Sequence, residues 1–292
     1  MLLADWGTTS RRAWLLDVAG QIVASSEDPG GMATVEPESW GTAFEDLKRA
    51  LGHPEPRLSL LAGMVGSKRG WREAPYLTCP AGLDDLAGAL CWVEPNAVAI
   101  VPGLSFLDGE TAEVMRGEET QLLGAIAAGR VPQDCFACHP GTHTKWVVVR
   151  GGRVTTFRTV MTGELFALLK AHSILAEQLR DTATAGADFE AGVDRGLAGG
   201  PVTADLFALR ANALLETGRI GNGAAYISGL LIGADVRAGL ALAEETTVEV
   251  IGRSDLAALY AAALGRSGRR VRQVDGGAAV LAGLRRLAEL VA

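Results

Sequence analysis

The sequence contains no long uninterrupted hydrophobic run, no basic leader and no excess of positive charge. Its most apolar long stretch, residues 224–243, is interrupted by Asp235 and Arg237, which argues against a membrane span. Residues 1–5 lack the basic start of a signal peptide. A formal net charge of −7 gives no general attraction for nucleic acid or anionic membranes. We therefore expect a cytoplasmic protein with neither nucleic acid nor membrane as a partner.

Cysteine is scarce, with four in the chain, and a cytoplasmic protein would keep them reduced. Residues 135–139 match the haem c attachment pattern, but that chemistry accompanies export, and we expect no export signal in this chain. A zinc site built from Cys135, Cys138, His139 and His143 fails in a strand, where residues i and i+3 point to opposite faces. We interpret residues 135–138 as a short buried strand.

Strands and helices alternate along the chain in a pattern that occurs twice. Each half reads as three strands, then helix, strand, helix, strand and helix. The strands expected in the first half are 2–5, 12–17, 21–26, 58–62 and 97–101, with helices after Pro37 and over 83–90 and 118–128. The strands expected in the second half are 135–138, 145–150, 153–157, 248–251 and 271–274, with helices from about 164 and over 255–264 and 277–290.

This alternation predicts an α/β fold, with helices on both faces of a mixed or mainly parallel sheet. The chain has 292 residues and 48% hydrophobic content, which is enough for two modest domains. We expect the domains to cover residues 1–130 and 131–292 and to face each other across a cleft. The oligomeric state stays open, with a homodimer as one alternative.

A short turn rich in glycine and threonine joins the first two strands of each half. Backbone N–H groups in such a turn can bind phosphate oxygens, and glycine allows their close approach. A carboxylate at the strand end can hold Mg²⁺ directly or through water. Each turn taken alone could also be an ordinary hairpin whose polar side chains satisfy the backbone. The candidate phosphate-binding residues are Gly7, Thr8 and Thr9 in the first turn and Gly141, Thr142 and Thr144 in the second, and Asp5 is the candidate for the metal.

Two other phosphate-binding signatures are absent from the sequence. No Gly-x-x-x-x-Gly-Lys-[Ser/Thr] segment is present, which excludes a P-loop enzyme. No Gly-x-Gly-x-x-Gly follows a predicted strand, so a dinucleotide-binding domain has no support.

Two further segments place candidate catalytic or nucleotide-binding residues at the start of a predicted helix. Glu118 and Glu119 begin a predicted helix, where a carboxylate can accept a hydroxyl proton while Arg116 binds an anion. Acidic residues also favour helix N-termini for electrostatic reasons alone. Gly252 follows a predicted strand and would let an adenine or ribose lie flat against the backbone. Ser254 would then cap the next helix, which is equally the pattern of an ordinary strand-to-helix turn.

These four segments, in this order, resemble the sugar-kinase, hexokinase, heat-shock protein and actin superfamily. The resemblance implies two ribonuclease H-like domains of the actin/hexokinase type, each βββαβαβα, around a central cleft. It also implies that ATP binds to the two turns and to residues 251–255. Carbohydrate kinases of this superfamily carry a Gly-Asp-Gln run with the catalytic base. Here the run is Gly117 to Gln121 with glutamates in place of aspartate, which leaves the base open between Glu118 and Glu119.

A closer resemblance is to the 2-dehydro-3-deoxygalactonokinases, and it covers nearly the whole chain. The segments that carry it are 62–67 with Trp71 and 74–76, then 114–122, 140–143 with 145–146, 157–165 and 228–234. It implies ATP and Mg²⁺ as cofactors, with Asp5 at the metal. It implies phosphorylation of 2-dehydro-3-deoxy-D-galactonate, a small sugar acid, on its carbon-6 hydroxyl in D-galactonate catabolism. The substrate-binding residues that we expect are Met64, Gly66, Ser67, Trp71, Tyr76, Arg116 and Arg158.

Three alternatives to this activity remain. The chain could phosphorylate a different sugar acid, or it could be a non-catalytic ATP-dependent switch on the actin-like fold. It could also use the same turns to hydrolyse a phosphate ester with water. Arg116, Arg158 and the segment 64–76 argue against a pure ATP switch, which would not need them.

Overall fold

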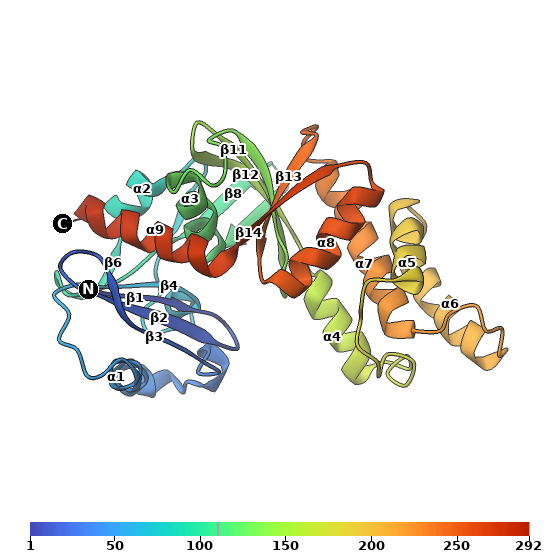
Figure 1. Cartoon of the computed structure of the whole chain (residues 1–292), viewed down its shortest axis with the longest axis horizontal. Coiled ribbons are helices and arrows are strands. Elements are labelled where there is room, and N and C mark those ends of the chain that lie inside the picture. Colours follow the sequence, from blue (N-terminus) through green and yellow to red (C-terminus); the bar gives the residue numbers. More distant parts are fainter. Residues whose placement is uncertain (110, 292) are drawn as a thin grey trace. The chain divides into compact units, whose positions relative to one another are not determined.

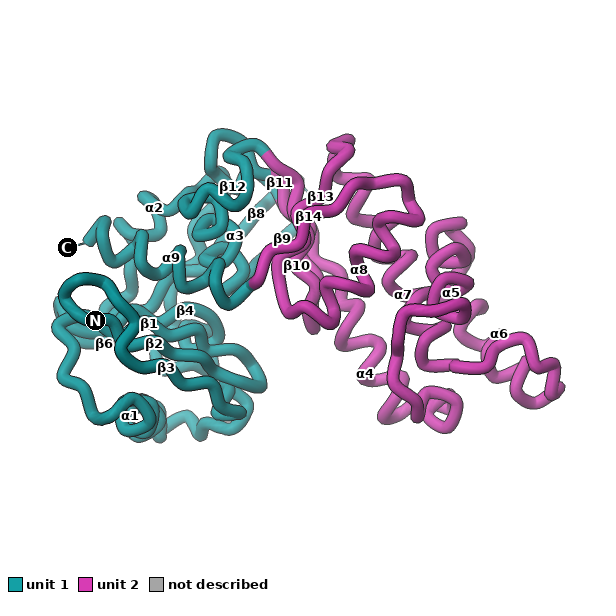
Figure 2. The backbone as a smooth tube through the Cα atoms, viewed as in Figure 1, with its two compact units in different colours: residues 1–134, 149–156, 276–292 teal, residues 135–148, 157–275 magenta. Residues whose placement is uncertain are grey.

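A computed structural model describes residues 1–109 and 111–291. The chain forms two compact units, shown in different colours in Figure 2. Unit 1 comprises residues 1–134, 149–156 and 276–292, and unit 2 comprises residues 135–148 and 157–275. Among the described residues, none of the helices is both long enough and apolar enough to cross a bilayer.

Unit 1 is built on a six-stranded sheet with the order β3-β2-β1-β4-β7-β6. The strand β1 is antiparallel to β2 and parallel to β4, which makes the sheet mixed. The strands are β1 (Leu2–Trp6), β2 (Arg11–Leu16), β3 (Ile22–Asp28), β4 (Ser59–Gly63), β6 (Cys91–Glu94) and β7 (Val98–Ile100). The helices are α1 (Trp40–Ala50), α2 (Leu83–Gly88), α3 (Glu118–Ala127) and α9 (Gly276–Val291).

The two faces of this sheet are covered by different helices. Helix α1 buries Trp40, Phe44 and Leu47, which lie at helical spacing, in one core with Trp6 of β1. Successive residues of a strand point to opposite faces, and β1 contacts α9 as well. Helix α9 also packs closely on α3 (Figure 1). A Cβ on Gly124 would lie 2.3 Å from a backbone oxygen of α9, so this helix pair depends on small residues.

A small three-stranded sheet, β5-β8-β9, completes unit 1. It consists of β5 (Tyr76–Thr78), β8 (Gly103–Asp108) and β9 (Thr111–Met115). Sequence analysis assigned no strands to these residues. The sheet matters for the site because β9 leads directly into Arg116 and the start of α3.

Unit 2 is built on the five-stranded sheet β12-β11-β10-β13-β14. Numbered within its own sheet, unit 2 has the strand order 3-2-1-4-5, and unit 1 has the order 3-2-1-4-6-5, in which β6 is an additional edge strand. The strands are β10 (Cys135–His139), β11 (Thr144–Arg150), β12 (Arg153–Val160), β13 (Thr247–Gly252) and β14 (Arg270–Asp275). The helices are α4 (Thr162–His172), α5 (Ala187–Leu197), α6 (Val202–Leu214), α7 (Gly223–Leu240) and α8 (Ser254–Arg266).

The predicted α/β class and the repeated actin/hexokinase-type fold are confirmed, because each unit has a mixed sheet that begins with three consecutive strands and continues with strands separated by helices. The expected division at residues 130/131 assigns the last helix to the second domain. In the structure α9 packs within unit 1, and residues 149–156 group with that unit as well.

Candidate active site

The first glycine-threonine turn follows the buried end of β1. The turn is closed by a hydrogen bond of 2.8 Å from the N–H of Gly7 to the carbonyl of Ser10. Asp5 lies near the end of β1, where it is buried. It forms an ion pair with Arg12, with 2.6 Å between Asp5 Oδ2 and Arg12 Nη2. Burial raises the pKa of the Asp5 carboxyl, and the Arg12 charge opposes that rise. The turn residues Thr8 and Thr9 are exposed.

Two glycines in left-handed conformations bring the start of α3 to this turn. Gly63 at the end of β4 has φ +88°, and a Cβ there would lie 2.6 Å from the carbonyl oxygen of Trp6. Gly117 has φ +103°, and its Cβ would lie 3.3 Å from the Cα of Gly63. Three predicted parts of the site that are distant in sequence therefore lie close together in unit 1. They are Asp5, the segment after β4 and the glutamates at the start of α3.

The two glutamates differ in environment. Glu119 is fully buried; its carboxylate accepts from the N–H of Gly117 at 2.9 and 2.7 Å and from the hydroxyl of Thr120 at 2.9 Å. Burial, with the nearby Glu118 charge as a second cause, raises the pKa of Glu119 to about 8. Glu118 is half-buried, and its Oε2 accepts from the N–H of Arg116 at 3.1 Å.

Arg116 forms the centre of a buried polar cluster. Its Nη2 donates to the carbonyl of Ala74 at 2.7 Å, and its guanidinium lies over the Tyr76 ring, 4.3 Å from the centroid. Its Nε and Nη1 are buried without a hydrogen-bond partner among the described residues, and so is the hydroxyl of Ser67. A Cβ on Gly66 would lie 2.9 Å from Nη1. Gly66, Ser67, Tyr76 and Arg116 thus belong to the same region.

The other two predicted substrate residues of unit 1 pack against its hydrophobic core. Met64 and Trp71 are partly buried beside that core, and the Trp71 ring lies 5.3 Å from the ring of Phe44. These contacts give both side chains a packing role whether or not they also touch a ligand.

The second glycine-threonine turn connects β10 and β11 in unit 2. Thr142 is exposed, and its carbonyl accepts from the N–H of Glu164 at 2.9 Å. Thr144, predicted as a phosphate ligand, is instead fully buried, and its hydroxyl lies 2.6 Å from that of Tyr260. Its side chain therefore belongs to the interior of the unit, while Gly141 and Thr142 remain at the surface of the turn.

Asp235 is the buried carboxylate around which this interior network forms. It accepts from Trp146 Nε1 at 2.7 Å, from the Thr162 hydroxyl at 2.6 Å and from the Tyr260 hydroxyl. Burial raises the pKa of Asp235, and these hydrogen bonds oppose the shift. Sequence analysis used Asp235 only to exclude a membrane span. An acidic residue inside an apolar helix was nevertheless a signal for a buried polar network.

The predicted adenosine segment lies next to the second turn. A Cβ on Gly252 would lie 3.6 Å from the carbonyl oxygen of Pro140, which precedes Gly141. Ser254 is exposed as the first residue of α8, and Arg253 takes the N-cap position.

Arg158, a predicted substrate-binding residue, is exposed on β12. His139, weighed in the sequence only as a zinc ligand, has an Nε2 that is buried without a partner among the described residues, and burial together with the Lys145 charge lowers its pKa to about 3.

Comparison with known proteins gives the family of the chain. A family model described as 2-keto-3-deoxy-galactonokinase matches residues 5–287. The chain belongs to this family. The Probable 2-dehydro-3-deoxygalactonokinase DgoK1 of Rhizobium meliloti is 37% identical over 287 residues, covering 96% of this chain and 94% of that protein. The 2-dehydro-3-deoxygalactonokinase of Escherichia coli is 36% identical, covering 99% and 97%. The resemblance seen in the motifs is confirmed.

Solved structures agree with this family and fold. A crystal structure from Sinorhizobium meliloti, named for the same activity, superposes on this galactonokinase family member with a TM-score of 0.91. The two are 37% identical, over 99% of this chain and 98% of that one. Component A of the Acidaminococcus fermentans (R)-2-hydroxyglutaryl-CoA dehydratase has a TM-score of 0.55 at 14% identity, covering 100% and 99%. That likeness extends to the fold alone.

Proposed function

We propose that this protein transfers the γ-phosphoryl group of ATP to the carbon-6 hydroxyl of 2-dehydro-3-deoxy-D-galactonate, as a cytoplasmic step of D-galactonate catabolism. Family membership and the names of the relatives support the substrate. The observation that carries the proposal is the buried guanidinium of Arg116, with two nitrogens unpaired among the described residues.

A buried charged donor without an acceptor is costly, so such groups usually meet a partner in the functional state. A carboxylate is the natural partner, because the planar guanidinium fork matches its two oxygens. The unpaired Ser67 hydroxyl offers a further donor. A sugar acid brings the required carboxylate, whereas a neutral sugar does not. We propose the exposed Arg158 of unit 2 as a second cationic contact for the substrate.

The exposed turns supply groups for the phosphates of ATP. We propose that unit 1 contributes the backbone of Gly7, Thr8 and Thr9 and that unit 2 contributes Gly141 and Thr142. Gly252, beside the second turn, would accept the adenosine without a side chain in the way. Binding by backbone N–H groups suits phosphoryl transfer, in which positioning and charge stabilisation dominate.

Mg²⁺ commonly binds one or two carboxylates and completes its shell with water and substrate phosphates. The described residues include no group of three or more metal-ligating side chains. The chain therefore suits an Mg²⁺ ion that is held by one or two carboxylates and otherwise by water and phosphate oxygens. Asp5 would hold the ion, with one of its oxygens already paired with Arg12. When bound, Mg²⁺ would neutralise charge on the phosphates.

Glu118 is the better candidate for the catalytic base. A base must be deprotonated before it accepts the hydroxyl proton, and Glu119, with a pKa of about 8, is mostly protonated at neutral pH. In the proposed step Glu118 takes the proton of the carbon-6 hydroxyl, and the alkoxide oxygen forms a bond to the γ-phosphorus. The bond from that phosphorus to the bridging oxygen breaks, and ADP leaves with the electron pair.

The test is ADP formation measured by a coupled assay, with 2-dehydro-3-deoxygalactonate, its carbon-4 epimer and a neutral sugar as acceptors. We expect turnover with the first acid, less with the epimer and none with the neutral sugar. Phosphate release without any acid would favour the phosphohydrolase, and nucleotide binding without turnover would favour the ATP switch. Sedimentation of the same preparation would show whether the chain forms a homodimer, which the sequence left open.

A further inference from the structure

Each glycine-threonine turn is contacted by a segment that follows the third strand of its own unit. In unit 1, β3 leads into residues 28–34, where the N–H of Met32 donates to the carbonyl of Gly7 and that of Ala33 to the carbonyl of Thr8, both at 2.9 Å. In unit 2, β12 leads into α4, and the N–H of Glu164 donates to the carbonyl of Thr142 at 2.9 Å. The same kind of backbone contact with the turn therefore occurs at the same topological position in both units.

A glycine stands at each point of closest approach. A Cβ on Gly31 would lie 2.4 Å from the carbonyl carbon of Thr9 and 2.5 Å from the oxygen of Thr8. A Cβ on Gly163 would lie 2.3 Å from the oxygen of Gly141 and 2.9 Å from the Cα of Thr142. All of these distances are shorter than real Cβ contacts, and the neighbouring atoms are backbone. Any side chain would therefore displace the turn.

These contacts also set the direction of the amides in the turns. In a planar trans peptide the carbonyl oxygen and the following N–H point in opposite directions. Because the carbonyls of Gly7 and Thr8 point toward residues 28–34, the N–H groups of Thr8 and Thr9 point away from that segment. No described backbone group accepts from either N–H, and both residues are exposed. Successive backbone N–H groups that are exposed in this way can bind an anion.

We propose that Gly31 and Gly163 are positioning residues that hold the two turns with their amides directed toward the phosphates of the nucleotide. This inference rests on the proposed ATP-dependent function. Neither glycine touches the ligand in this account; each acts through the backbone of the turn that it contacts.

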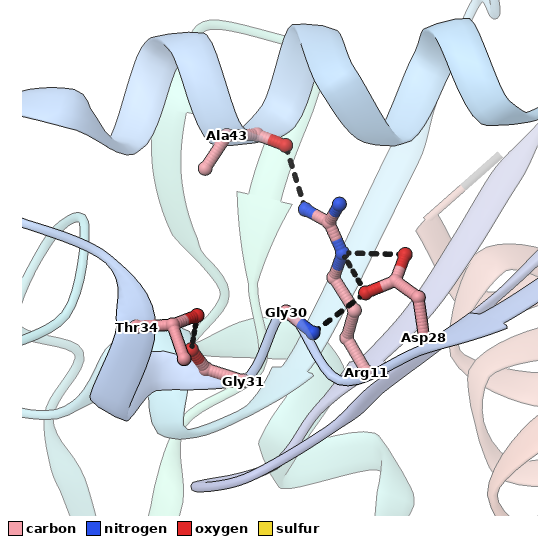
Figure 3. A network of polar contacts seen from close by, with 6 residues as sticks. All are labelled: Arg11, Asp28, Gly30, Gly31, Thr34 and Ala43. Carbon is pink, nitrogen blue, oxygen red and sulfur yellow. Dashed lines mark hydrogen bonds and ion pairs between the residues drawn. The ribbon is translucent and has the colours of Figure 1, made fainter.

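Each positioning segment is held by side chains outside the turn. Arg11 donates from Nε to Asp28 at 2.9 Å and from Nη1 to the carbonyl of Ala43 at 2.7 Å, and Asp28 accepts the N–H of Gly30 at 2.7 Å (Figure 3). The hydroxyl of Thr34 donates to the carbonyl of Gly31 at 2.9 Å. In unit 2, the hydroxyl of Thr162, at the start of α4, donates to the buried Asp235. The segments are thus anchored without help from a nucleotide.

The test compares Gly31→Ala and Gly163→Ala with two control variants, Gly41→Ala in α1 and Gly265→Ala in α8. A Cβ on either control glycine meets nothing within 4 Å. We expect each positioning variant to raise the KM for ATP and the Kd for a non-hydrolysable ATP analogue by about 10-fold to 100-fold, as displacements near 1 Å do. The KM for the sugar acid should stay within about twofold of wild type, and the controls should leave all three constants unchanged. A folded Gly31→Ala protein with wild-type nucleotide affinity would overturn the inference.

Hydrogen exchange on the wild-type protein covers the case in which the alanine variants do not fold. Without nucleotide, the amides of Met32, Ala33 and Glu164 should be protected, and those of Thr8 and Thr9 should exchange freely. The ATP analogue should then protect Thr8 and Thr9. Fast exchange at Met32 and Ala33 would overturn the inference while leaving the proposed function intact. A wild-type chain with no affinity for the analogue would overturn the proposed function itself.

Discussion

The fully buried carboxyl group of Glu119 accepts the N–H of Gly117 with both of its oxygens, at 2.9 and 2.7 Å, at the start of α3. This relationship fixes the left-handed Gly117, whose close approach to Gly63 joins α3 to the end of β4. Glu119 therefore holds the start of α3 in place, whereas Glu118 next to it is half-buried and is the residue that we propose as the base.

Glu118→Gln should lower kcat by about 10²-fold to 10⁴-fold, because the amide cannot accept the hydroxyl proton. The KM for ATP should change little, since the substitution is nearly isosteric. Glu119→Gln serves as the matched control and should retain most of the turnover, because Glu119 is mostly protonated at neutral pH already. Steady-state kinetics on both variants decide the assignment. Loss of turnover in Glu119→Gln alone would transfer the role of base to Glu119.

Glu119 should also make stability depend on pH. Its pKa is about 8 in the folded protein and near its ordinary value of 4.5 in the unfolded chain. Between these values the folded state holds a proton that the unfolded state has lost, so its stabilising contribution is complete below pH 4.5 and disappears as pH rises through about 8. The Tm of Glu119→Gln relative to wild type should therefore increase from pH 5 to pH 9. A constant Tm difference across that range in thermal melts would contradict the shift.

Arg116→Lys should raise the KM for the sugar acid and leave the KM for ATP nearly unchanged. Lysine keeps the charge but loses the planar fork and the stacking on Tyr76. A lost hydrogen bond to a charged group is worth about 1.5–3 kcal/mol, which corresponds to about 10-fold to 150-fold in KM. Arg130→Lys, at an exposed position of the same unit, is the control. Equal rises for both substrates would assign Arg116 to the nucleotide.

The two threonines of the second turn should separate binding from stability. Thr142→Val changes an exposed side chain and should weaken nucleotide binding by about 0.5–1.5 kcal/mol, with an unchanged Tm. Thr144→Val removes the buried partner of Tyr260 and should cost about 1–3 kcal/mol of unfolding free energy, with little effect on nucleotide affinity. Denaturant unfolding and calorimetric titration measure the two quantities. The opposite assignment of effects would show that the Thr144 hydroxyl reaches the phosphates.

Much of the fold follows from local patterns in the sequence. Alternating strands and helices, read twice, predict both large sheets, because hydrophobic periodicity is local to each element. The strands β5, β8 and β9 were not predicted. The sequence pattern predicted no strand in residues 63–80 or 102–117, and β5 has only three residues.

The site is predictable where its residues are adjacent in the chain and not where it depends on packing. The turns at residues 5–10 and 140–145 are visible as motifs, and so are the glutamates after Gly117. The inward orientation of Thr144 depends on Tyr260, which lies 116 residues further along the chain. The close approach of Gly31 to Thr8 and Thr9 depends on where β3 ends in space, and a glycine in a sequence does not reveal what its missing side chain would meet.

The most direct test of the account is the identity of the product formed from ATP and 2-dehydro-3-deoxygalactonate. We predict that ³¹P NMR of the reaction will show a new phosphate monoester, coupled to the methylene protons of carbon 6 and formed in equal amount to ADP. Accumulation of ADP with inorganic phosphate as the only other phosphorus product would contradict the central claim that this chain is a sugar-acid kinase.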